Sequence, residues 1–258
     1  EAISPPGDEP AGGWVDYAEW AELADAGDGP AADAPPSPSP SPSPSPSPSP
    51  SPSPPADDRR ARIARMDWDE LATTVAGCTA CDLCRTRTRT VFGTGDRRAR
   101  LMIVGEAPGR DEDLQGEPFV GEAGRLLNEM LRAIGLSRSS VYIANVLKCR
   151  PPNNRDPLPA EVVACRAHLE RQIALVAPAL ILAVGRISAH ELLAVQTPVG
   201  RLRGRLHRYG PGGIPLIVTW HPAYLLRAPA EKGKSLDDLE RVLDVLEGRA
   251  TPAGTPPA

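Results

Sequence analysis

Five cysteines are the residues whose spacing points most directly to chemistry. Cys78 and Cys81 are separated by two residues, a spacing that lets two thiolates from one turn face the same metal, and Cys149 and Cys165 form a second pair with fifteen residues between them. Four thiolates can hold a zinc ion or an iron-sulfur cluster, so the spacing alone leaves both open. Cys84 is a fifth thiol, surplus to such a site. The alternative is that some of these residues are small buried hydrophobes.

Acidic, amide and imidazole side chains follow short apolar runs that are typical of buried strands. Glu106, Asn145 and His221 each lie within two residues of the end of such a run. Because the carboxyl ends of parallel strands meet at one edge of a sheet, we expect these groups to share a site. The runs span residues 101–104, 141–144, 180–184 and 216–219.

Helical patterns lie between and after these runs. In one of them Leu127, Met130, Leu131 and Ile134 recur at helical spacing and form one apolar stripe. Strands that alternate with helices predict an α/β fold, in which a four-stranded parallel sheet is covered by helices on both faces. The expected helices span residues 122–135, 159–177, 187–194 and 236–246.

The first 57 residues differ in composition from the rest of the chain. They hold 16 of the 31 prolines, ten acidic residues and no Lys or Arg, and they include nine consecutive Ser-Pro pairs. Alternating prolines exclude helix and sheet, so this tract is expected to be an extended linker. We therefore expect a disordered acidic tail and linker at 1–57, one domain at 58–250 and a disordered end at 251–258. A short helix at 14–26 that docks on a protein partner is the alternative for the tail.

Charge and hydropathy exclude some classes of protein. The formal net charge of −4 separates into an acidic tail and a remainder with 23 acidic against 29 basic residues, which allows a polyanionic partner. The chain has no apolar run of about 18 residues and no secretion signal, so we expect no membrane span and a cytoplasmic protein. Thiols in a reducing compartment favour metal ligation over disulfides.

Five segments together resemble a family 4 uracil-DNA glycosylase, in order and at that family's spacing, over roughly residues 72–246. The resemblance implies an α/β/α sandwich and a four-iron four-sulfur cluster held by Cys78, Cys81, Cys149 and Cys165, with Cys84 as the spare thiol. The cluster is expected to be structural, because hydrolysis of the N-glycosidic bond between a base and its sugar needs no redox step. The segments are C-x2-C at 78–81, GEAPGRDED at 105–113, PFVGEAG at 118–124, IANVLKCRPPNNRDPLP at 143–159 and HPAYLLR at 221–227.

The resemblance also implies which residues read the base and what the protein does. A flipped-out uracil would stack on Phe119, and the amide of Asn145 would accept from N3–H and donate to O4, a pattern that cytosine presents reversed. His221, as a neutral imidazole, would donate to O2 of the departing base. The implied function is a monofunctional glycosylase that hydrolyses the N-glycosidic bond of deoxyuridine in single- or double-stranded DNA and leaves an abasic site for base excision repair.

A glycine-containing loop and two carboxylates are expected beside the sugar. Backbone N–H groups from Gly105 through Ala107 to Gly109 can approach the ring and the sugar, because the side chains there are small or absent. The resemblance places Ala107 where family 1 enzymes carry an Asp, so no general base can act from that position. We therefore assign water positioning and cation stabilisation to Glu112, with Glu106 second. A hydrated acidic loop is the alternative.

Arginines are expected to contact the DNA backbone. Arg227 is expected to bind a phosphate, and Leu225 and Leu226 before it are candidates for a wedge that fills the vacated stack. Two arginine clusters, at residues 85–89 and 201–208, are further candidates for phosphate contacts.

Two other activities compete with this interpretation. A related branch captures uracil-DNA covalently through a His in a long basic insertion, and residues 150–164 contain neither a His nor such an insertion. A non-catalytic iron-sulfur or zinc module that binds DNA is the second alternative, and the presence of Phe119, Asn145 and His221 argues against it. We expect the enzyme to act as a monomer.

Overall fold

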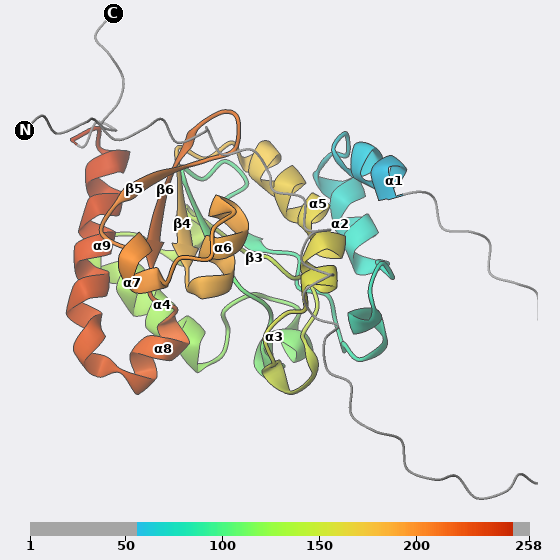
Figure 1. The fold of residues 1–258 in the computed structure, drawn as a ribbon, viewed down its shortest axis with the longest axis horizontal. Helices are drawn as coiled ribbons and strands as arrows, with labels where there is room; N and C mark the ends of the chain where they lie inside the picture. Colours follow the sequence, from blue (N-terminus) through green and yellow to red (C-terminus); the bar gives the residue numbers. More distant parts are fainter. Residues whose placement is uncertain (1–55, 250–258) are drawn as a thin grey trace, which may run out of the picture.

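The computed structural model describes residues 56–249, so the predicted tail, nearly all of the linker and the predicted C-terminal end lie outside the described residues. Within this range the strands form a six-stranded sheet in the order β1-β3-β2-β4-β6-β5 (Figure 1). The strands are β1 (Thr94–Gly95), β2 (Leu101–Gly105), β3 (Tyr142–Asn145), β4 (Leu180–Val184), β5 (Leu206–Tyr209) and β6 (Ile214–Thr219).

The four central strands are the four that the apolar runs predict, and they are parallel to one another. The predicted sheet of four strands was incomplete, because β1 and β5 add an antiparallel strand at each edge. Strands β2, β3 and β4 are buried along their whole length, which explains their continuous apolar runs. Strand β1 has only two residues and β5 reads LHRY, so neither edge strand presents such a run.

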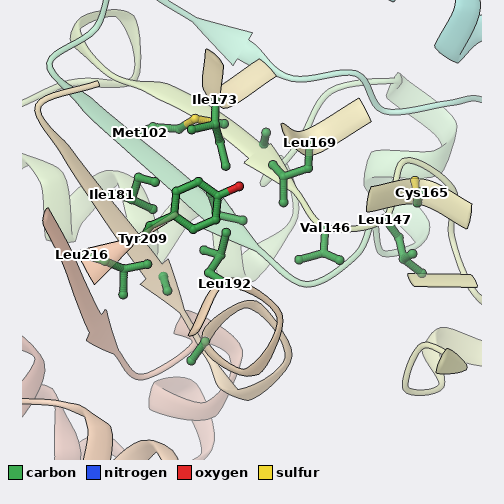
Figure 2. Close-up of a cluster of buried hydrophobic side chains, with 14 of the residues drawn as sticks. Met102, Val146, Leu147, Cys165, Leu169, Ile173, Ile181, Leu192, Tyr209 and Leu216 are labelled. Carbon is green, nitrogen blue, oxygen red and sulfur yellow. The ribbon is translucent and has the colours of Figure 1, made fainter. Parts of the chain in front are cut away.

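Helices cover both faces of the sheet, which confirms the predicted α/β/α sandwich. Met102 and Val104 belong to a core shared with α5, α6 and α7, whereas Ile103 belongs to a core shared with α4, α8 and α9. Figure 2 shows Met102 in the first core, with Ile173 of α5 and Leu192 of α6. The helices are α3 (Arg110–Gln115), α4 (Glu122–Ala133), α5 (Pro159–Val176), α6 (Arg186–Leu193), α7 (Val199–Leu202), α8 (Pro222–Arg227) and α9 (Lys232–Leu246). Among the described residues, no helix is long and apolar enough to cross a membrane.

Two helices precede the sheet and pack on α5 at one end of the molecule, with α9 at the other end (Figure 1). Ile63 and Leu71, one from each helix, form a small separate core with Ala167 of α5. This packing brings the segment with Cys78 to the helix that carries Cys165. The two helices are α1 (Ala56–Ile63) and α2 (Trp68–Ala76), and the short 3-10 turns are η2 (Asp82–Arg85), η3 (Arg138–Ser140), η4 (Pro152–Asn154) and η5 (Pro229–Glu231).

Candidate active site

A cavity of about 680 Å³ lies beyond the carboxyl ends of the four parallel strands. Its wall is built from the loops that follow β2, β3, β4 and β6, the edge at which the sequence predicts the site. The structure brings eight of the predicted catalytic and substrate-binding residues to this wall: Glu106, Ala107, Gly109, Glu112, Phe119, Asn145, His221 and Arg227.

Phe119 and Asn145 meet at Gly105, the last residue of β2. A Cβ atom on Gly105 would lie 2.4 Å from Asn145 Oδ1 and 2.6 Å from Phe119 Cζ, so a side chain at Gly105 would displace both groups. The side-chain oxygen of Asn145 is buried and accepts no hydrogen bond from the described residues. A buried acceptor without a donor is costly, and a ligand N–H at this point would remove the cost.

His221 faces Phe119, with ring centroids 5.6 Å apart and planes inclined by 31°. It caps α8, and its Nδ1 accepts the N–H of Ala223 at 3.2 Å. Burial, together with the positive charge of Arg227, lowers the pKa of His221 to about 4 against the opposing effect of Glu112. A neutral ring whose Nδ1 accepts carries its proton on Nε2, so His221 has an N–H to donate.

Glu112 ties two segments of the cavity wall together. Its carboxylate accepts the backbone N–H groups of Gly109 at 3.1 Å, Val120 at 2.9 Å and Gly121 at 3.0 Å. A carboxylate has about four positions for hydrogen-bond donors, so these three bonds leave one. Glu112 therefore fixes the loop after β2 against the segment that follows Phe119.

Glu106 lies in the cavity wall near an ion pair formed by Arg186 and Asp156. Burial, reinforced by the charge of Asp156, raises the pKa of Glu106 to about 7, although Arg186 opposes the shift. A carboxyl group with this pKa is present in both protonation states near neutral pH, which suits a group that handles protons or water.

The four cysteines predicted as metal ligands lie close enough for their charges to act on one another. The thiolates of Cys81 and Cys78 contribute to raising the pKa of Cys149, after burial as the main cause. Burial raises the pKa of Cys165 to about 12. Figure 2 shows Cys165 at one end of the hydrophobic core, next to the chain that leads from β3. Thiols this costly to ionise need a cation nearby if they are to act as thiolates.

Hydrogen-bond donors surround these sulfurs, as an anionic group would require. Arg87 Nη1 lies 3.1 Å from Cys149 Sγ, and the backbone N–H of Lys148 donates to the Sγ of Cys165 at 3.3 Å. Lys148 is itself buried, and its ammonium donates to Gln172 Oε1 at 2.6 Å and to a backbone carbonyl at 2.7 Å. The donor set therefore fits a negatively charged thiolate centre.

The described side chains include no group of three or more His, Cys, Asp or Glu residues placed to hold a single metal ion. The case for a metal centre here accordingly depends on the four thiols and on the donors around them. Cys84 also lies near the first pair, because its charge contributes to raising the pKa of Cys81.

Two arginines and one leucine that were candidates for DNA contacts lie in surroundings that the sequence does not indicate. Arg87 is directed at Cys149, and Arg203 donates to the buried carboxylate of Asp238 at 3.0 Å, so neither is free for a DNA phosphate in this arrangement. Leu225 is 1% exposed and belongs to the core, so its prediction as a wedge is wrong; Leu226 is 36% exposed and remains a candidate.

Some residues of the cavity wall were missed by sequence reasoning. Trp220 and Tyr224 stack with ring centroids 4.7 Å apart, and the indole N–H of Trp220 is buried without an acceptor among the described residues. Both residues flank His221, and only that proximity could have singled them out. Arg110, Arg155 and Arg186 also line the cavity.

Comparisons with known proteins agree with this geometry. A family model described as the uracil DNA glycosylase superfamily matches residues 92–247. The type-4 uracil-DNA glycosylase of Archaeoglobus fulgidus is 43% identical over 180 residues, which are 67% of this chain and 90% of that protein. The enzyme of Pyrobaculum aerophilum is 42% identical over 180 residues, which are 67% of this chain and 92% of that protein. The enzyme of Thermotoga maritima is 43% identical over 170 residues, which are 65% of this chain and 88% of that protein. The predicted resemblance is thus confirmed, and the chain belongs to the type-4 family of uracil-DNA glycosylases.

Proposed function

We propose that this chain is a monofunctional glycosylase that hydrolyses the N-glycosidic bond of deoxyuridine in DNA, releases uracil and leaves an abasic site for base excision repair. The observation that carries the proposal is the buried Oδ1 of Asn145, which has no donor among the described residues and stands beside the ring of Phe119. The N3–H of a flipped-out uracil is a donor of the right kind for this atom, and the ring of Phe119 is a stacking surface for the base.

Asn145 also supplies the discrimination against cytosine. With Oδ1 accepting from N3–H, the amide N–H₂ of Asn145 is directed at O4 of uracil. Cytosine has an unprotonated N3 and an amino group at C4, so both contacts would place like groups together. A site built to hydrogen-bond one ring rejects the other because its own buried polar atoms are left without partners.

Bond cleavage leaves the electron pair on N1 of uracil and positive charge on the sugar. We propose that His221 Nε2–H donates to O2 as negative charge develops there, without transferring its proton, since the neutral ring is the stable form. The oxygen of a water molecule then bonds to C1′ of the sugar, and one of its protons leaves to a nearby acceptor.

Glu106 and Glu112 are the proposed carboxylates for the sugar and the water. Glu112 has three backbone donors on its carboxylate and so can hold at most about one water more. Glu106 accepts no hydrogen bond from the backbone N–H groups of the loop after β2, and its raised pKa of about 7 suits it to receive a proton. Comparing Glu106→Gln with Glu112→Gln in single-turnover reactions assigns the two roles.

We also propose that Cys78, Cys81, Cys149 and Cys165 hold a four-iron four-sulfur cluster, with zinc as the alternative and Cys84 as the spare thiol. When bound, such a cluster would cross-link the segment before the sheet to the loop after β3, and the hydrolysis itself consumes no electron. Iron and sulfide content, with the visible spectrum of anaerobically purified protein, decides between the two metals.

DNA that contains uracil, single- or double-stranded, is the proposed partner, with Arg227 at the cavity wall as a phosphate contact. A monomeric state, a cytoplasmic location and a protein partner for the acidic tail stay predictions from the sequence.

The test is release of free uracil from single-stranded and G·U oligonucleotides. Wild-type protein is expected to release it over many turnovers, and the double variant Asn145→Ala, His221→Ala is expected to release almost none. Equal release by both proteins would refute the assigned site, whereas no release by either would favour a non-catalytic DNA-binding module. A protein-DNA adduct that persists on a denaturing gel would show covalent capture instead of turnover.

A further inference from the structure

The backbone of Phe119 has an unusual conformation for an aromatic residue. Its φ angle is +54°, in the left-handed region that residues other than Gly, Asn and Asp seldom occupy. Phe119 lines the cavity, and the whole residue is 6% exposed. A conformation of this kind persists only where the surroundings hold it, and such positions concentrate at functional sites.

The first turn of α4 packs directly on this backbone. A Cβ atom on Gly124 would lie 1.9 Å from the carbonyl oxygen of Phe119, so glycine is required for the approach. Hydrogen bonds to a carbonyl oxygen have preferred directions, so they can hold the orientation of this group in addition to the packing.

The guanidinium of Arg138, in η3, supplies those hydrogen bonds. Nη1 donates to the carbonyl oxygen of Phe119 at 2.9 Å, and Nη2 donates to that of Pro118 at 2.7 Å. Arg138 is also held by Glu117 Oε1 at 2.9 Å and lies 3.4 Å from Asn128 Oδ1. Its side chain is only 23% exposed. The planar fork of an arginine can hold two successive carbonyls at once, which the single ammonium of a lysine cannot do with the same geometry.

The N–H groups that follow Phe119 are held as well, and the first of them belongs to the same peptide group as the carbonyl of Phe119. Glu112 accepts the N–H groups of Val120 and Gly121. The carbonyls of residues 118 and 119 are thus fixed by a cation and the amides of residues 120 and 121 by an anion. The peptide groups before and after Phe119 are therefore both held, and between them the ring of Phe119 is presented to the cavity.

We propose that Arg138 is a positioning residue for uracil excision, which holds Phe119 in the left-handed conformation that presents its ring to the base. Arg138 does not line the cavity, so it acts through Phe119 and not on the substrate. This inference rests on the proposed role of Phe119 as the stacking surface.

The test is a double-variant cycle on single-turnover uracil release. Arg138→Gln is expected to lower the rate about tenfold, the effect of reducing the share of molecules with a competent loop to one tenth. In a Phe119→Ala background the same change is expected to alter the rate less than twofold. Arg132→Gln is the matched control, because Arg132 is an exposed arginine that pairs with Glu129 and touches neither carbonyl.

A spectroscopic readout separates positioning from general damage to the fold. The chain has only two Phe residues, so fluorophenylalanine gives two ¹⁹F resonances, and Phe119→Ala identifies which one belongs to Phe119. Arg138→Gln should shift or broaden that resonance and leave the Phe92 resonance in place. If Arg138→Gln does not fold, Arg138→Lys replaces it in both measurements, with a smaller loss expected.

The outcomes distinguish the two proposals. A loss from Arg138→Gln that is equally large in the Phe119→Ala background overturns the positioning role and leaves the stacking role of Phe119 intact. A Phe119→Ala variant with the wild-type rate overturns the stacking role and, with it, the inference on Arg138. An unchanged ¹⁹F resonance for Phe119 in the Arg138 variant also overturns the inference.

Discussion

Replacing Gly105 with alanine tests whether the cavity depends on a missing side chain. The added methyl group would stand 2.4 Å from Asn145 Oδ1 and 2.6 Å from Phe119 Cζ. Non-bonded contacts are optimal at about 3.5–4.0 Å, so the amide of Asn145 and the ring of Phe119 would each have to move away by about 1 Å. Both residues are buried, at 2% and 6% exposure.

A displacement of about 1 Å in a group that positions the substrate can lower the rate about a hundredfold. Overpacking of this kind typically costs about 1–3 kcal/mol in the free energy of unfolding. We expect Gly105→Ala to show both effects, measured by single-turnover uracil release and by urea denaturation. Gly233→Ala in α9 is the control, because nothing lies within 4 Å of a Cβ there. A Gly105→Ala enzyme within threefold of the wild-type rate would refute the assignment of Asn145 and Phe119 to the base.

Three further predictions concern the carboxyl group of Glu106, the buried ammonium of Lys148 and the segment at residues 1–57. The pKa of Glu106 is raised to about 7, so the single-turnover rate should fall as Glu106 becomes protonated below that pH. Glu106→Gln should remove this pH dependence. His221, with its pKa lowered to about 4, stays neutral and adds no step to the pH profile between about pH 5 and 9. Lys148→Met leaves the carbonyl of Asn145 and Gln172 Oε1 without their ammonium donor, so the free energy of unfolding measured in urea should fall by about 1–3 kcal/mol for each acceptor. Deletion of residues 1–57 should leave uracil release unchanged, and its loss would mean that the tail takes part in the fold.

The strands that the sequence predicts correctly are those whose burial leaves a continuous mark. Strands β2, β3, β4 and β6 lie in the middle of the sheet, so nearly every residue must be apolar, and their predicted limits differ from the observed ones by at most two residues. The edge strands β1 and β5 exist because β3 and β6 offer them a free edge. That condition belongs to the assembled sheet and leaves no run in the local sequence.

The candidate site also contains residues that the local sequence identifies and residues that only the folded chain reveals. Asn145, His221 and Phe119 were identified because each stands in a distinctive segment, and the structure brings all three together. What holds them comes from distant parts of the chain. Arg138 reaches back nineteen residues to the carbonyl of Phe119, and Arg87 reaches Cys149 across sixty-two. An arginine among threonines reads as a surface residue or a DNA contact, and only the folded chain shows that Arg87 is directed at a sulfur.

The route of the chain after β3 gives a physical reason for the proposed metal centre in an enzyme that consumes no electrons. Asn145 and Cys149 are four residues apart, on a segment that leaves the sheet and has no helix of its own before η4. Leu147 N–H donates to the carbonyl of Glu106 at 3.0 Å, and Lys148 N–H donates to Cys165 Sγ at 3.3 Å. The same short segment thus contacts the loop after β2 at one point and the cysteine site at the next. Fixing Cys149 and Cys165 to one metal centre would therefore restrain the backbone that orients the amide of Asn145. Loss of the metal centre should then weaken base recognition even in molecules whose sheet stays folded.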